Sequence, residues 1–183
     1  MQLALVVVHA ADAGRTRDTE ERRRTWLEEL QQLLPGRRVE VRTAGGPFED
    51  EAEGLWSQFD AGKKKLTPQK LVLETKRDGL TSIVALGRQV ARMDADLVLG
   101  EGQGAVIAAG YARPALLEFA LQARNVQREE VRLVVGAWSK VKGCVLLKPR
   151  LGKAGVGLKL LELALPELFD LAYPRQGPRI YGL

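Results

Sequence analysis

The chain of 183 residues is long enough for one domain with a single hydrophobic core. Its apolar share of 45% and charged share of 28% exclude an intrinsically disordered chain, and no apolar stretch is long enough to span a bilayer. The net charge of +5 favours acidic partners or anionic surfaces, but most basic residues stand close to acidic ones, so we expect solvated helix faces.

The first half of the chain alternates strand and helix patterns. A β-branched run over 3–8 predicts a buried strand, and apolar residues at helical spacing predict a helix over 19–34. Residues 37–43 alternate charge with valine, which predicts a strand near the sheet edge. Residues 45–68 show no period and indicate a surface excursion with Trp56 and Phe59 packed back against the core.

The second half continues the alternation. We expect a helix over 80–93, a strand over 96–99 and a glycine-rich turn over 100–104. Helices over 105–111, 114–124 and 127–138 follow, then a strand over 143–147 and a helix over 158–171. Strands that alternate with helices predict an α/β fold with a doubly wound, mostly parallel sheet between helical layers. We expect one domain over 1–172 and an extended C-terminal tail over 173–183.

The turn Gly100-Glu101-Gly102-Gln103-Gly104 connects a predicted strand to a predicted helix and allows three interpretations. As a dinucleotide fingerprint its third glycine comes one residue early, and Glu101 adds negative charge where a phosphate would lie. As a nucleophile elbow, Gly-x-Ser-x-Gly, it has both flanking glycines. As a structural turn, its glycines provide positive φ and close helix–strand packing.

With Ala105, this run resembles the α/β-hydrolase superfamily, especially small serine hydrolases whose elbow reads Gly-Phe-Ser-Gln-Gly-Ala. His9 and Ala10 resemble that family's histidine-bearing oxyanion loop, and the strand ending near Lys148 resembles the one that follows the elbow helix. The resemblance covers roughly residues 1–150. It implies a truncated, three-layer α/β-hydrolase-like sandwich that ends before the strands carrying the family's acid and base.

The departures from the family pattern argue against triad catalysis. Gly102 stands where the nucleophile is required, and the single histidine of the chain, His9, precedes the elbow instead of following it. We therefore expect no catalytic residues, and a degenerate elbow and cleft formed by Gly100, Glu101, Gly102, Gln103 and Gly104.

Other candidate sites are weaker. His9 is expected to be a structural group at a strand end, and Asp94 and Asp96 lie at the opposite end of their strand from Glu101, so they form no acid–base pair with it. One histidine and one cysteine give no metal-ligand cluster, and no cofactor is expected. Cys144, within an apolar strand, is expected to be an inert core thiol.

Basic residues gather in the second half of the chain. Lys148, Arg150 and Lys153, beside glycine-rich turns, are candidate contacts for an anion or a partner. A second basic cluster, Lys63, Lys64 and Lys65, falls in the excursion and is more consistent with a solvated loop than with a phosphate contact.

These observations predict a non-catalytic α/β-hydrolase-like domain that serves as a binding or structural component of a larger assembly, with a protein partner and no membrane span. The alternatives are a hydrolase of unusual mechanism that orients water with Glu101 or His9, and a nucleic-acid- or phosphate-binding module. The single cysteine predicts the cytoplasm or another reducing intracellular compartment. Oligomeric state stays open.

Overall fold

The computed structural model describes residues 4–10, 16–50, 53–56, 68–147 and 179–182. Five strands form an all-parallel sheet in the order β2-β1-β5-β6-β7. In chain order the elements are β1 (Leu5–Ala10), α1 (Thr16–Leu33), β2 (Val39–Ala44), β3 (Phe48–Asp50), β4 (Glu53–Leu55), α2 (Pro68–Met93), β5 (Leu97–Glu101), α3 (Gln103–Tyr111), α4 (Pro114–Ala123), α5 (Arg128–Lys140), β6 (Gly143–Leu147) and β7 (Arg179–Gly182).

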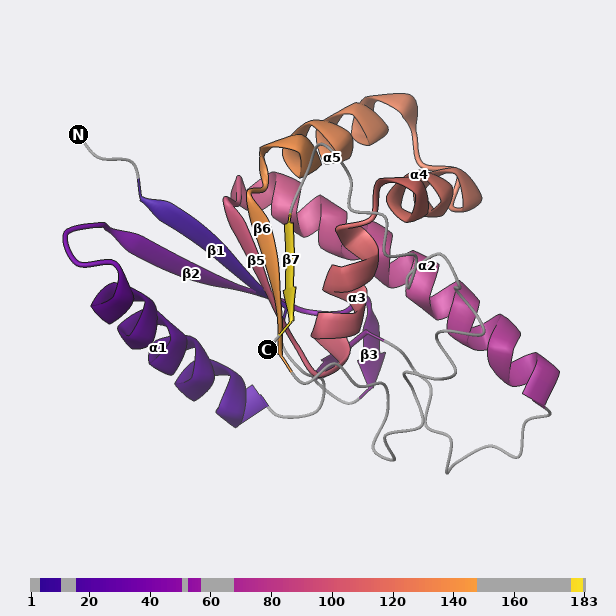
Figure 1. The fold of residues 1–183 in the computed structure, drawn as a ribbon. Coiled ribbons are helices and arrows are strands. Elements are labelled where there is room, and N and C mark those ends of the chain that lie inside the picture. Colours follow the sequence, from indigo (N-terminus) through magenta and orange to yellow (C-terminus); the bar gives the residue numbers. More distant parts are fainter. Residues whose placement is uncertain (1–3, 11–15, 51–52, 57–67, 148–178, 183) are drawn as a thin grey trace.

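Helices cover both faces of this sheet, as the alternating pattern predicts (Figure 1). On one face α2 and α3 pack against the strands, with α4 and α5 outside them, around fully buried residues such as Ile83, Leu86 and Ile107. On the other face α1 packs against β2, above a smaller apolar cluster. The result is a three-layer α/β fold, in which the connections that leave the neighbouring strands β1 and β5 run to opposite faces of the sheet.

The helices of the thicker layer show local signals for where they begin and end. Pro114 opens α4, where its missing N–H costs no hydrogen bond, and the acidic Glu129 and Glu130 lie in the first turn of α5. The α3 helix is buried on nearly every side, and its small residues suit a helix enclosed between a sheet and other helices. Trp138 of α5 donates its indole N–H to the carbonyl of Tyr111 at 3.0 Å.

Two strand pairings in the structure were not predicted from the sequence. The excursion contains a short antiparallel hairpin of β3 and β4, which the lack of period had concealed. Trp56, after the hairpin, is completely buried, as expected, and its carbonyl accepts a hydrogen bond from the Ser82 hydroxyl. Phe59 lies outside the described residues. In the tail, Arg179–Gly182 pairs in parallel with β6, so this extended segment is also a strand of the sheet.

No single helix among the described residues is long and apolar enough to cross a membrane. The pair α3 and α4 passes that test jointly, but the two helices are bent by 96° at their junction, and most of α3 is buried in the core of the fold.

Candidate functional site: the carboxyl end of the sheet

The turn between β5 and α3 is sharper than the sequence indicated. The strand extends through Glu101 and the helix begins at Gln103, so Gly102 alone joins them. Gly102 has φ 56° and ψ −117°, a backbone conformation that L side chains rarely adopt. Its N–H donates to the carbonyl of Leu147 on β6 at 3.0 Å, which fixes the turn to the neighbouring strand.

Gly100 meets a different requirement, the close approach of helix to strand. A Cβ at this position would lie 2.5 Å from the Ala105 Cα, 2.8 Å from the Gly104 carbonyl oxygen and 2.9 Å from the Ala108 Cβ. Two of these neighbours are backbone atoms, which cannot move aside as a flexible side chain can. The small residues of α3 and Gly100 together let the helix lie directly on β5.

His9 and Glu101 come together at this edge of the sheet. They end the neighbouring parallel strands β1 and β5, where Ala10 is in register with Gly100. The His9 Nε2 lies 3.3 Å from the Glu101 Oε2, with the His9 side chain fully buried and that of Glu101 17% exposed. This contact is a hydrogen bond in one tautomer of the neutral ring and an ion pair when the ring is protonated.

A third polar group belongs to the same corner. Thr43 of β2 is the register partner of His9 on the other side, so both side chains project from the same face of the sheet. The Thr43 hydroxyl and the His9 Nδ1 are buried without a hydrogen-bond partner among the described residues. The three groups end β2, β1 and β5, at the point where the connections leave for opposite faces, which is where doubly wound sheets bind ligands.

Sequence reasoning placed His9 and Ala10 in an oxyanion-like loop. In the structure both are the last residues of β1, and both are completely buried. The pairing of His9 with Glu101 was missed because 92 residues separate them, and only the strand order makes them neighbours. A usable signal was present, since each is a polar residue at the end of an apolar strand in a predicted parallel sheet.

The two aspartates lie at the opposite end of β5, where they hold the sheet together. Asp96 accepts a hydrogen bond from the Val6 N–H at 3.0 Å and from the Lys142 ammonium at 2.9 Å. Burial alone would raise the pKa of the Asp96 carboxyl, but these two donors outweigh it and hold that pKa below its ordinary value. Asp94 faces Lys140 at 3.5 Å, so neither aspartate forms a pair with Glu101.

Cys144 lies within β6 and is completely buried. Burial raises the pKa of its thiol well above the ordinary value, because the thiolate would have to form in an apolar environment. A thiol in this state is a poor nucleophile and a poor metal ligand. Among the described residues, no three His, Cys, Asp or Glu side chains are placed to hold a metal ion.

The predicted anion or partner contacts Lys148, Arg150 and Lys153 lie outside the described residues, as does the cluster Lys63, Lys64 and Lys65. Two basic residues that precede Lys148 in the sequence are described: Lys140 lies 3.5 Å from Asp94, and Lys142 lies 2.9 Å from Asp96. A hollow of about 640 Å³ is found elsewhere, between α1 and β2.

The comparisons give no family for this arrangement: no family model, no curated protein and no solved structure matches the chain.

Proposed function

We propose that the chain is a non-catalytic α/β-hydrolase-like domain that serves as a binding or structural component of a larger assembly. The observation that supports this most directly is Gly102. It has the strained conformation of a sharp strand-to-helix turn, the place where a hydrolase carries its nucleophilic serine, but it has no side chain. A chain with this turn but without the serine has the backbone scaffold of such a hydrolase and lacks the nucleophile that ester hydrolysis requires.

The burial of His9 supports the same conclusion. A general base must reach the proton that it removes, and His9 is completely buried with its Nε2 against Glu101. The pair therefore serves to join β1 and β5 at the carboxyl edge.

The elbow interpretation is tested by giving the turn a nucleophile. We expect the wild type and Gly102→Ser to show no hydrolysis of short fluorogenic esters above buffer. Ala109→Ser, on the same helix, is the matched control for an added hydroxyl. We expect Gly102→Ser to fold with a loss of about 1–2 kcal/mol, because serine disfavours positive φ. Strong esterase activity in Gly102→Ser alone would show that a base is present and contradict the proposal.

A second candidate is a hydrolase of unusual mechanism acting on small esters, and the 3.3 Å contact between His9 and Glu101 favours it. A histidine and a carboxylate at hydrogen-bond distance can orient and activate a water molecule. This candidate requires turnover by the wild type that falls with Glu101→Gln. If the wild type does not turn over esters, the candidate is excluded for that substrate class.

Partner and compartment follow as parts of the same proposal. The tagged chain, purified from its source cells at moderate salt, should retain a stoichiometric protein partner identified by mass spectrometry. Nucleic acid is the alternative partner, through the basic second half, and its binding would weaken steeply with added salt. The lone cysteine, buried and unpaired, supports a reducing compartment such as the cytoplasm.

A further inference from the structure

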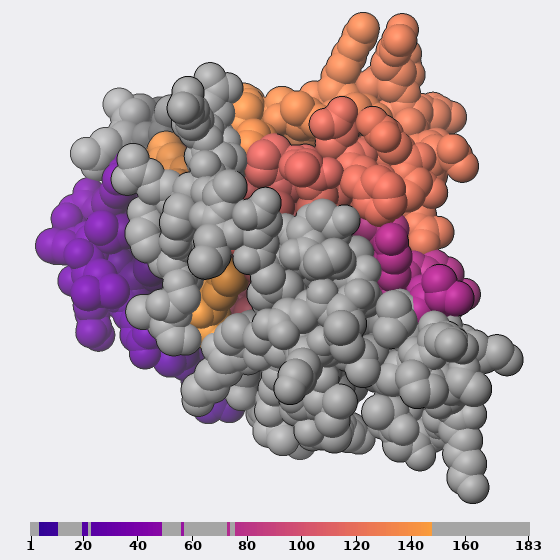
Figure 2. Space-filling model, turned by 45° about the vertical axis from the view of Figure 1, so that its right-hand side comes forward, coloured from indigo at the N-terminus to yellow at the C-terminus, as the bar shows by residue number. Residues whose placement is uncertain are grey.

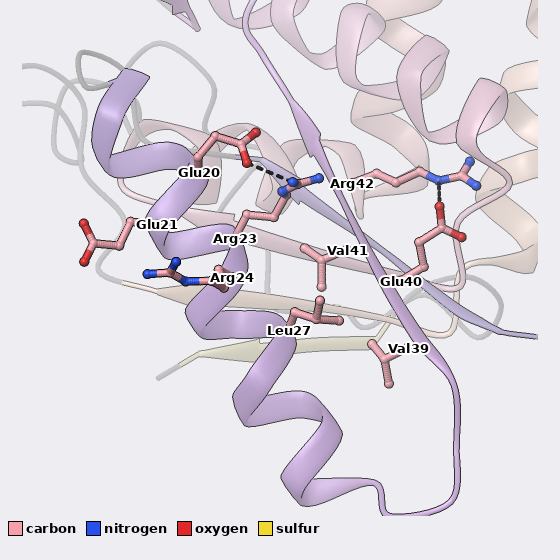
Figure 3. Close-up of a pocket in the computed structure, with 9 residues that line it drawn as sticks. All are labelled: Glu20, Glu21, Arg23, Arg24, Leu27, Val39, Glu40, Val41 and Arg42. Carbon is pink, nitrogen blue, oxygen red and sulfur yellow. Dashed lines mark hydrogen bonds and ion pairs between the residues drawn. The ribbon is translucent and has the colours of Figure 1, made fainter.

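The strand β2 forms one edge of the sheet, and the described residues place no strand on its outer side. Beside this edge lies the hollow of about 640 Å³, lined by α1 and β2 (Figure 3). Leu27 of α1 and Val39 and Val41 of β2 face one another across it. Glu40 and Arg42 project to the other face of the strand, where they are joined at 2.8 Å.

The backbone of β2 determines which groups face outward. Leu5 donates its N–H to the carbonyl of Arg38 at 2.8 Å, and Leu5 is in register with Val39. Because successive residues of a strand direct their N–H and C=O groups to opposite sides, the even-numbered residues of β2 pair with β1. The N–H and C=O groups of Val39, Val41 and Thr43 therefore point away from the sheet.

We propose that two copies of this chain associate through antiparallel pairing of their β2 edges, around a two-fold axis at Val41. In this register Val41 of each copy lies opposite Val41 of the other, and Val39 lies opposite Thr43. These residues all have outward backbone groups, so each pair exchanges both of its hydrogen bonds. The two sheets then form one continuous sheet across the dimer, and the β2 edge of each copy is no longer exposed.

The charges on β2 favour a second copy over an unrelated strand. With the axis at Val41, Glu40 of each copy lies opposite Arg42 of the other, so the strand is complementary to itself. An axis at Glu40 or at Arg42 would place like charges opposite one another. The side chains of Glu40 and Arg42 are 44% and 40% exposed, so both can exchange their contact within the strand for one across the interface. Arg42 also donates from Nη1 to the Met93 carbonyl at 3.2 Å, a bond that does not use the Nε facing Glu40.

The hollow provides space on the opposite face of the strand. Val39 and Val41 are only 5% exposed, but the charged residues of α1 that line the hollow beside them, Glu20, Glu21, Arg23 and Arg24, are exposed. In the proposed pairing the added strand places its own Val39, Val41 and Thr43 on this same face, so apolar side chains of both copies lie next to one another beside the half-buried Leu27. This inference does not depend on the elbow, and it would hold whether or not the domain is catalytic.

Sedimentation and light scattering of the full chain test the proposal, and the wild type should be a dimer. Glu40→Arg and Arg42→Glu each place like charges across the axis, so each should raise the dissociation constant by about tenfold or more. An equimolar mixture of the two variants pairs a basic strand with an acidic one and should form a heterodimer. The double exchange Glu40→Arg with Arg42→Glu should restore the homodimer.

Matched controls carry the same charge changes elsewhere. Glu118→Arg on α4 and Arg128→Glu on α5 should leave the dimer unchanged, alone and mixed. In hydrogen exchange, the amides of Val39, Val41 and Thr43 should become protected as concentration rises. A wild type that stays monomeric overturns the proposal, and so does a dimer that persists in both single variants. A dimer that is lost instead on Leu133→Lys, an exposed leucine of α5, also overturns it.

Discussion

The two faces of the sheet differ in how completely their helices are buried. On the α2–α5 face, strands and helices both contribute residues that solvent does not reach, including Val8 of β1 and Tyr111 of α3. On the α1 face, the buried residues among those described belong to strands, and the described side chains of the helix that pack against them, Trp26, Leu27, Leu30 and Leu34, are partly buried. Figure 2 shows these two parts, α1 in violet and α4–α5 in orange, at opposite sides of the molecule.

The difference between the two faces suggests separate roles for them, one in stability and one in association. Among the described residues, the thick face contributes more to stability, because it holds the larger buried cluster and the free energy gained by burial scales with the apolar area removed from water. The α1 face keeps the exposed Leu33 and the partly buried Leu27 on its helix, beside the edge of β2 that no described strand pairs, and a partner can cover these groups. A domain proposed to act by association needs such a face.

The largest expected effect tests the contact between α3 and β5 on the thick face. Gly100→Ala should lower the free energy of unfolding by about 3 kcal/mol or more, because the new methyl group meets backbone atoms. Gly136→Ala is the matched control, since a Cβ there meets nothing within 4 Å and alanine favours the α5 helix. It should stabilise the chain by about 0.5–1 kcal/mol. Urea denaturation measures both, and equal effects would refute this account of the glycine.

The comparison of faces is tested directly by one leucine from each. Leu86→Ala on α2, where the side chain is completely buried, should cost about 2–3 kcal/mol. Leu30→Ala on α1, where the side chain is partly exposed, should cost about 1 kcal/mol. Denaturation at a concentration where the chain is monomeric is required, because a dimer would add its own stability. A larger cost at Leu30 would show that α1 is as well buried as α2.

The smallest effect concerns the sheet between the two faces. Asp96 has a lowered pKa in the folded chain, so its contribution is present above its unfolded pKa of about 3.8 and is lost as pH falls through the folded value. Asp96→Asn should lower the free energy of unfolding by about 1 kcal/mol at neutral pH. The difference from wild type should shrink on acidification below about pH 4. A difference independent of pH would show that the charge is unimportant.

Local patterns were sufficient for much of the fold. The strand over 143–147 was predicted with the bounds that the structure gives, and the helix over 114–124 ends one residue earlier. Helix α2 begins twelve residues before the predicted Leu80, at Pro68. The apolar residues of its first turns, 71–73, are consecutive and are followed by polar residues, so they form no stripe at helical spacing. The predicted helix over 158–171 lies outside the described residues.

The site was less accessible to sequence reasoning than the fold. The glycines of the turn could be identified because a positive φ angle and a close helix–strand approach both require glycine, and glycine is visible in the sequence. The contact between His9 and Glu101 depends on β1 and β5 being neighbours, and the chain order alone does not reveal the strand order. Which edge strand is open, and which backbone groups it presents, likewise follows only from the pairing.

The burial of Cys144 gives the chain a reporter of its own motions. It is the only cysteine, it lies in the interior strand β6, and solvent does not reach it. A thiol reagent can therefore react only when the sheet opens, and the labelling rate measures how often it does. The unmodified chain can in this way report whether a ligand or a second copy slows the breathing of its central strands.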